Sequence, residues 1–227
     1  MKLRTAFPTI LAALAVLGAT QPHASAAIII SQYYEGTSNN KFIELYNSGA
    51  TAVDLGTDAY KVSLYSNAAR ENWKAGTAST PAATTVALTG SLAAGATLTI
   101  AHGSAALPAY AIPADVSNSG VANFNGDDSV VVWTGATYSF ASVVDAFGSL
   151  AAGGFGDVSY VRNIDITTGT NADFDAADWT AFSLAAVANA APGTNERLDF
   201  HAAIPEPASL VLAGMGLFAA IVVRRRG

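Results

Sequence analysis

The 227-residue chain has no cysteine and a formal net charge of −6. The lack of cysteine excludes disulfide bonds and thiol chemistry, and the acidic excess disfavours binding to nucleic acid phosphates. Between residues 27 and 203 there are sixteen acidic and only six basic side chains. We interpret this balance as a solvated acidic surface that suits solubility, and the alternative is an attraction for divalent cations.

The first 26 residues have the order of a secretory signal peptide. Lys2 and Arg4 precede an apolar run at residues 10–17, and the small residues Ala24 and Ala26 follow it. The apolar run is too short to span a bilayer stably. We therefore expect residues 1–26 to be removed by cleavage after Ala26.

The middle of the chain has the pattern of an all-β domain. Short runs rich in Val, Ile, Thr, Tyr and Phe alternate with clusters of Gly, Asn, Asp and Ser, and no long helical period occurs. The predicted strands are Ile28–Tyr34, Lys41–Tyr46, Tyr60–Ser66, Thr97–His102, Ser129–Trp133, Val143–Phe147, Val158–Arg162 and Trp179–Ser183. Many short strands with frequent turns favour a sandwich or a barrel.

Local patterns add detail to this prediction. In residues 97–101, Leu98 and Ile100 point to one face, which predicts a half-buried strand. Turns are predicted at residues 47–49 and 125–127 because Asn, Gly, Ser and Asp favour turn conformations. The stretches 75–95 and 103–122 are rich in small residues, and we expect them to be long surface loops.

Few residues suggest catalysis. A hydrolase needs a nucleophile with a base, or a metal ion, but the nucleophile-elbow, zinc-protease and P-loop motifs are all absent. We interpret His102 and Ser104 as a strand end and loop, and expect His201 to be solvated. Asp127 and Asp128 are expected to be turn carboxylates that accept local amide hydrogen bonds, rather than an acid-base pair. We assign no catalytic residue, metal ligand or cofactor.

One acidic loop leaves calcium binding open. Its four aspartates are Asp165, Asp173, Asp175 and Asp178. Oxygen ligands from a flexible loop suit Ca²⁺, although no EF-hand spacing is present, and a solvated acidic loop is the favoured interpretation.

The three tryptophans Trp73, Trp133 and Trp179 are expected to anchor the core or the sheets. The alternative is a row that stacks on sugars, which would require exposed aromatic rings.

The C-terminal stretch combines three features in order. Pro205, Glu206 and Pro207 form a rigid extended tripeptide; residues 208–223 are uncharged and mostly apolar; and Arg224, Arg225 and Arg226 follow. The apolar run would be about 24 Å long as a helix, a short membrane span that snorkelling arginines make workable. The positive-inside rule places the arginines in the cytoplasm as an anchor and the rest of the chain outside.

This order resembles the PEP-CTERM sorting signal of bacterial exported proteins. The resemblance implies that residues 205–227 are a sorting signal processed by the membrane enzyme exosortase, with Pro205, Glu206 and Pro207 as its motif. Residues 197–204 would then form a stalk between the domain and the signal.

A second resemblance covers residues 27–196. The segments 42–47, 53–55, 92–95, 124–133, 144–148, 174–179 and 192–195 are similar, in order, to pieces of the lamin-tail domain. The resemblance implies an immunoglobulin-like β-sandwich, flanked here by the signal peptide and a short C-terminal transmembrane helix. The family transfers no catalytic residue to this chain.

Together these features predict an exported, cell-surface or matrix-associated protein with a structural or adhesive role and no enzymatic activity. Its expected partners are exosortase, the cytoplasmic membrane, and exopolysaccharide or other surface proteins, with no nucleic acid. It would be anchored transiently in the inner membrane before reaching the cell surface or the extracellular space. The alternatives are a secreted hydrolase acting on the matrix and a calcium- or glycan-binding module.

Overall fold

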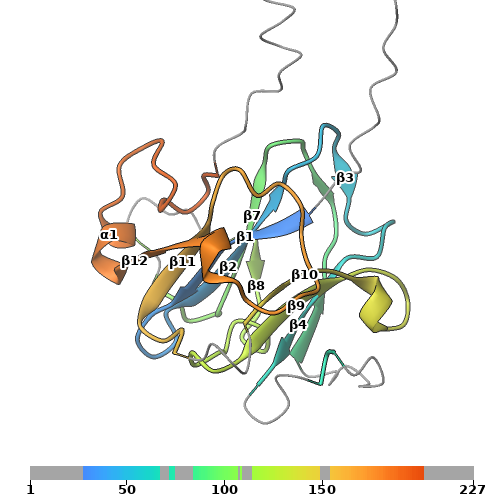
Figure 1. Cartoon of the computed structure of the whole chain (residues 1–227), viewed down its shortest axis with the longest axis horizontal. Helices are drawn as coiled ribbons and strands as arrows, with labels where there is room; N and C mark the ends of the chain where they lie inside the picture. Colours follow the sequence, from blue (N-terminus) through green and yellow to red (C-terminus); the bar gives the residue numbers. More distant parts are fainter. Residues whose placement is uncertain are drawn as a thin grey trace, which may run out of the picture.

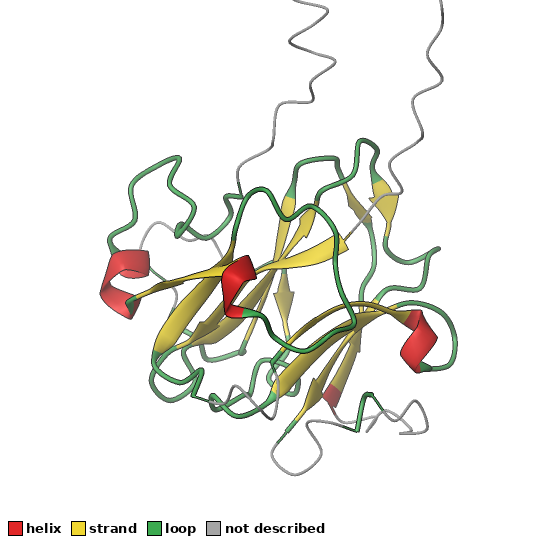
Figure 2. Ribbon diagram, in the orientation of Figure 1, coloured by secondary structure: helices red, strands yellow, loops and turns green. Residues whose placement is uncertain are grey.

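Two packed β-sheets dominate the computed structural model, which describes residues 28–66, 72–74, 84–106, 108, 114–148 and 154–201 (Figures 1 and 2). The larger sheet has the spatial order β12 (Trp179–Phe182), β11 (Val158–Arg162), β1 (Ile28–Glu35), β2 (Lys41–Asn47), β7 (Thr97–Ala101), β8 (Val116–Ser117). The smaller sheet has the order β10 (Val143–Phe147), β9 (Ser129–Trp133), β4 (Lys61–Tyr65), β5 (Thr85–Ala87). A separate pair joins β3 (Val53–Asp54) to β6 (Ser91–Leu92).

Helical structure is minor in the described residues. It consists of η3 (Phe140–Ser142), η5 (Ala176–Asp178) and α1 (Leu184–Ala188). The predicted all-β sandwich is therefore confirmed at the level of fold class. None of the helices in the described part of the chain is long and apolar enough to cross a membrane.

All eight predicted strands are present, with ends that differ by at most one residue. The prediction of loops at 75–95 and 103–122 is wrong in part, because β5, β6 and β8 lie within these stretches. Each of these strands has only two or three residues and pairs with a strand distant in sequence. Leu88, Leu92 and Val121 from the same stretches are buried, so residues expected on the surface contribute to the core.

The main core lies between the two sheets. Ile30, Ile43 and Leu45 of the larger sheet and Val62 and Val130 of the smaller one belong to a single buried cluster. Aromatic rings fill one part of this core. They include Tyr33, Phe124, Phe147, Phe155, Tyr160, Phe174 and Trp179, and the Tyr33 and Phe147 rings stack with centroids 4.1 Å apart.

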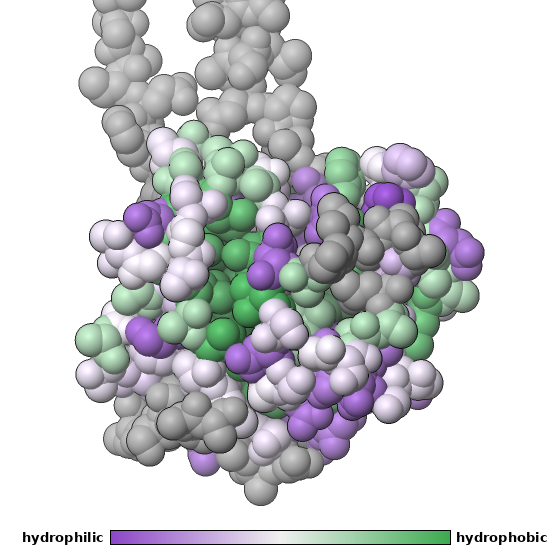
Figure 3. Space-filling model, turned by 180° about the vertical axis from the view of Figure 1, so that it is seen from behind, coloured by the Kyte–Doolittle hydropathy of each residue, from purple (hydrophilic) through white to green (hydrophobic). Residues whose placement is uncertain are grey.

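Both sheets are also covered on their outer faces. Tyr65, Trp73, Val131 and Trp133 form a second cluster with Tyr138 and Ala146. A third cluster on the larger sheet joins Tyr34, Phe42 and Ala101 to Val187 and Leu198. In the view from behind, apolar side chains also gather near the centre of the molecule within a polar rim (Figure 3).

The strand at residues 97–101 is therefore not half-buried as predicted. Thr99 and Ala101 are only 3% and 2% exposed, because residues 183–201 pack over their face of the sheet.

Candidate functional site

His102 and Ser104 form a local turn. The backbone N–H of Ser104 donates a 3.0 Å hydrogen bond to His102 Nδ1, and His102 directly follows the last residue of β7. Ser104 is exposed. This geometry confirms the interpretation as a strand end and loop.

Asp128 is a buried turn carboxylate, as expected. Its Oδ2 accepts a 3.0 Å hydrogen bond from the backbone N–H of Asn125. The turn depends on Gly126, which has φ +86° and lies so close to Gly156 that a Cβ would be 2.5 Å from the Gly156 nitrogen. The carboxylate therefore serves the local structure.

The four aspartates of the acidic loop do not assemble into a cation site. Asp173 forms an exposed salt bridge with Lys74, and Asp175 Oδ1 accepts from the backbone N–H of Ala177 as the N-cap of η5. Asp165 lines a separate small pocket. Within the described ranges, no group of three or more acidic or histidine side chains is arranged to hold a metal ion.

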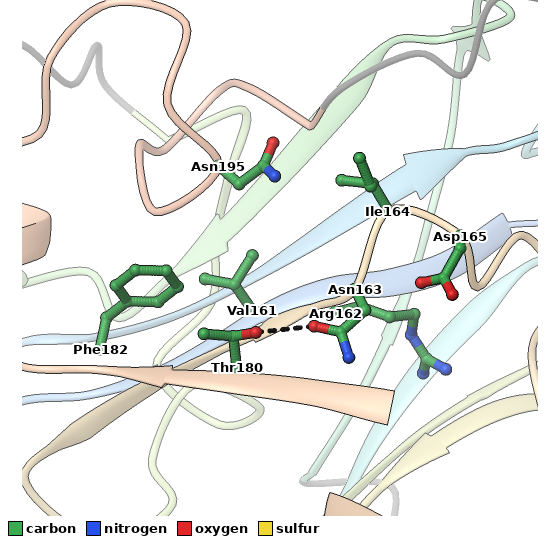
Figure 4. A pocket seen from close by; sticks show the side chains of 8 residues that line it. All are labelled: Val161, Arg162, Asn163, Ile164, Asp165, Thr180, Phe182 and Asn195. Carbon is green, nitrogen blue, oxygen red and sulfur yellow. Dashed lines mark hydrogen bonds between the residues drawn. The ribbon is translucent and has the colours of Figure 1, made fainter. Parts of the chain in front are cut away.

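That small pocket lies at the end of β11, beneath the loop that carries Asn195 (Figure 4). Its volume is about 150 Å³, and Thr180 donates a 2.7 Å hydrogen bond to Asn163 Oδ1 in its wall. Asn195 faces it from above, while the Arg162 guanidinium points away (Figure 4).

All three tryptophans are buried, which confirms their predicted role as anchors. Trp73, Trp133 and Trp179 are 0%, 2% and 8% exposed. The Nε1–H of Trp133 donates a 2.9 Å hydrogen bond to the hydroxyl of Ser63. These rings offer no platform on which a sugar could stack.

A buried ion pair joins the two sheets and was not predicted. Asp145 of β10 and Arg162 of β11 are 2.7 Å apart, and both are almost completely buried. Asp145 also accepts backbone hydrogen bonds from Ile30 and Thr170, and Arg162 Nε donates to the carbonyl of Ile30. Burial raises the pKa of Asp145, which the Arg162 charge opposes. A charged residue inside an apolar strand such as 143–147 was the signal in the sequence.

A segment that we call the C-terminal cover, Ser183–His201, packs on the outer face of the six-stranded sheet. Its α1 helix begins at Ser183, whose hydroxyl accepts from the backbone N–H of Ala186. Val187 and Leu198 are buried against Tyr34 and Phe42 of the sheet. Residues 197–201 of the expected stalk are thus packed on the sandwich.

Glu44 of β2 lies beneath this cover. Its Oε2 accepts a 2.7 Å hydrogen bond from the backbone N–H of Asp199, and its Oε1 accepts one of 2.7 Å from the Ser31 hydroxyl. Burial raises the pKa of Glu44 to about 8, although these hydrogen bonds oppose the shift. Glu44 was not predicted as a site residue because the sequence pattern shows only that it lies within a strand, Lys41–Tyr46.

His201 is buried, so the prediction that it is solvated is wrong. It is 5% exposed, and its ring centroid lies 4.7 Å from that of Tyr46. Its Nδ1 has no hydrogen-bond partner among the described residues. Burial, followed by the charge of Arg162, lowers the pKa of His201 to about 4. The cover places this ring against the sheet, which sequence spacing alone does not reveal.

A polar groove of about 430 Å³ opens at the end of the sandwich where β1 turns into β2. Its polar lining includes Ser38, Lys41, Ser66, Thr84, Asn123, Asn125 and Asp128. Lys41 forms a buried salt bridge with Glu35, so its charge is compensated. The groove therefore combines neutral hydrogen-bonding groups with the carboxylate of Asp128, which accepts from the backbone N–H of Asn125.

The predicted sorting and processing residues lie outside the described residues. They are Ala24, Ala26, Pro205, Glu206, Pro207, Arg224, Arg225 and Arg226, together with the predicted span 208–223.

Two family models match the chain. The model of the Lamin Tail Domain matches residues 21–173, more than half of the chain, and that of the PEP-CTERM protein-sorting motif matches residues 203–226. No curated protein and no solved structure matches the chain. Strand β12 and the C-terminal cover lie between the two matched segments.

Proposed function

The chain belongs to the lamin tail domain family and carries a PEP-CTERM sorting motif, and from this we propose that it is a non-enzymatic structural or adhesion protein of the cell surface or extracellular matrix. The motif itself implies an exported protein that is sorted through exosortase. The observation that carries the proposal is the position of this motif, which begins two residues after the last described residue of the folded domain, His201.

We extend this proposal to the processing steps. Residues 1–26 are removed as a signal peptide, residues 208–223 span the inner membrane, and Arg224–Arg226 remain in the cytoplasm. Exosortase then acts at Pro205–Pro207 and releases the domain toward the cell surface.

The placement of the two ends of the described domain supports an outward-facing domain. Ile29, near the start of β1, pairs with Tyr46, and the His201 ring packs on the same tyrosine. Both ends of the described domain therefore meet at one end of the larger sheet. The polar groove lies beside Lys41, at the opposite end of β2, where it would face a matrix partner.

The roles of the buried acids favour a non-enzymatic domain. Asp145 is paired with Arg162, and Glu35 with Lys41. Glu44 accepts from the backbone of Asp199, and Asp128, which lines the polar groove, accepts from the backbone of Asn125. Each of these carboxylates has a partner within the domain, and a hydrolase would need one that is available to substrate.

The test is the intact mass of the surface-associated protein from strains with and without exosortase. We expect the mature protein from the exosortase-containing strain to lack residues after about Pro207. A Pro205→Ala/Pro207→Ala variant should keep its tail. Full-length protein ending at Gly227 in the strain with active exosortase would contradict the proposal.

Activity assays separate this function from the secreted-hydrolase alternative. The purified protein should show no turnover in a panel of esterase, phosphatase, nuclease and glycosidase substrates. Turnover that a substitution in the polar groove abolishes, for example Asn123→Ala, would favour the hydrolase.

A further inference from the structure

We propose that contacts between Leu198–His201 and the six-stranded sheet hold the sorting motif close to the folded domain and limit its access to exosortase. We call these contacts the clasp. In it, Asp199 and His201 contact Glu44, Thr99 and Tyr46 of the sheet, and Leu198 packs in the cluster of Tyr34, Phe42 and Ala101. This inference rests on the proposed function, and Glu44 and Thr99 are positioning residues in it.

Asp199 is the centre of the clasp. Its backbone N–H donates to Glu44 Oε2 at 2.7 Å, and its Oδ1 accepts from the Thr99 hydroxyl at 3.0 Å. Its φ of +59° lies in the left-handed region, which non-glycine residues adopt uncommonly, although aspartate tolerates it better than most. The two hydrogen bonds to the sheet therefore maintain a backbone conformation that the isolated segment would not favour.

Apolar contacts hold the residues on both sides of Asp199. Leu198 is 1% exposed in a cluster with Tyr34, Phe42 and Ala101. His201 packs on Tyr46. The chain is thus held to the sheet up to the last described residue before the sorting motif.

The length of chain after the clasp explains its effect. Pro205 follows His201 by four positions, which span at most about 14 Å when fully extended. While the clasp is closed, the folded domain therefore lies within this distance of the processing motif and crowds an enzyme embedded in the membrane. Release of residues 198–201 would add about 14 Å to the tether.

The position of the clasp in the chain fits this role. The lamin tail match ends at residue 173 and the sorting-motif match begins at residue 203. The clasp lies between them, so it couples the folded domain to the tail.

The first test measures the rate of tail removal by pulse-chase in cells that contain exosortase. Thr99→Val keeps the β-branched shape and removes the hydroxyl that donates to Asp199. Losing one such hydrogen bond should raise the open population, and with it the processing rate, by about threefold to tenfold. Thr137→Val, an exposed position after β9 of the smaller sheet, is the matched control and should process at the wild-type rate.

A second variant separates positioning from a loss of stability. Six Gly and Ser residues inserted between His201 and Ala202 lengthen the tether and leave the clasp intact. This insertion should also accelerate processing, and Thr99→Val should add no further effect in its background. A persistent additive effect of Thr99→Val would mean that the substitution acts by destabilising the domain, which would overturn the inference.

Hydrogen exchange on the full chain in detergent reports on the clasp without exosortase. The amide of Asp199 should exchange about threefold to tenfold faster in Thr99→Val than in wild type, and at an unchanged rate in Thr137→Val. Unchanged exchange in Thr99→Val and in Leu198→Ala, or equal processing of all variants by an active exosortase, would overturn the clasp. Failure of exosortase to process the wild-type protein would instead overturn the proposed function.

Discussion

Arg162 and Asp145 face each other across the two sheets, with Arg162 Nη2 2.7 Å from Asp145 Oδ2. Ile30 offers its backbone N–H to Asp145 and its carbonyl to Arg162, because the ladder between β1 and β11 begins only at Gln32. The guanidinium also lies 4.3 Å above the centroid of the Trp179 ring. The pair thus connects β1, β10, β11 and β12 at one point of the interior.

We expect Arg162→Ala to destabilise the domain by roughly 3–5 kcal/mol, because it leaves the Asp145 charge buried without its partner. Chemical denaturation gives the free energy of unfolding. The double variant Arg162→Met/Asp145→Leu should recover much of the loss. Lys74→Ala, which removes the exposed salt bridge to Asp173, is the control and should cost less than about 1 kcal/mol. If Arg162→Ala and Lys74→Ala lowered the unfolding free energy by similar amounts, burial of the Asp145–Arg162 pair would not explain its effect on stability.

Trp133→Ala should destabilise the domain by roughly 3–5 kcal/mol. The ring is 2% exposed and packs edge-on against Tyr138 with centroids 5.3 Å apart, so its removal leaves a cavity. Urea denaturation monitored by circular dichroism measures the loss. The comparison is Ile164→Ala, an exposed large-to-small change that should stay within about 0.5 kcal/mol. A loss below about 1 kcal/mol for Trp133→Ala would be inconsistent with this packing.

Glu44 should make the domain less stable as the pH rises. Its folded pKa of about 8 is above the ordinary value of 4.5, so its contribution is full below pH 4.5 and is lost as the pH rises through 8. Glu44→Gln imitates the neutral acid, since it keeps an acceptor for Asp199 and a donor for Ser31. The difference in unfolding free energy between variant and wild type, measured at several values across this range, should grow in favour of Gln. A constant difference would show that Glu44 does not change its proton affinity on folding.

His201 should make the domain less stable as the pH falls. Its folded pKa of about 4 is below the ordinary value of 6.5, so its contribution is present above pH 6.5 and is lost as the pH falls through 4. His201→Phe keeps an aromatic ring against Tyr46 and cannot become charged. Melting temperatures between pH 7 and pH 4 should fall less for the variant than for wild type. Parallel pH profiles would argue against burial of a neutral imidazole.

Calcium should leave the melting temperature unchanged. Asp173 is paired with Lys74 and Asp175 caps η5, so the acidic loop does not present a set of converging oxygen ligands. Thermal melts in EDTA, in millimolar calcium and in millimolar magnesium should coincide. An increase of a few degrees with calcium alone that Asp173→Asn abolishes would restore the calcium-binding alternative.

Local sequence was sufficient to predict the main strands. Ser129–Trp133 is found at its predicted bounds because a run of β-branched residues between turn signals has few other ways to bury its side chains. The Asn125-Gly126-Asp127 turn was predictable for a similar reason, since Gly126 has φ +86°. The resemblances to the lamin tail domain and the sorting motif were also present in the sequence, and both family models match.

The site depended on contacts that local patterns do not encode. Thr99 and Asp199 are 100 residues apart in the chain, and Asp145 and Ile30 are 115 apart. Alternation along residues 97–101 predicted a solvated outer face, yet the C-terminal cover buries Thr99 and His201 there. Whether a polar side chain is solvated or buried depends on which distant segment packs over it. Local patterns in the sequence are therefore enough to locate the strands and the sorting signal. The partners of Glu44, Asp145 and His201 depend on the folded chain, because a buried polar group is stabilised by whichever groups the fold brings within reach.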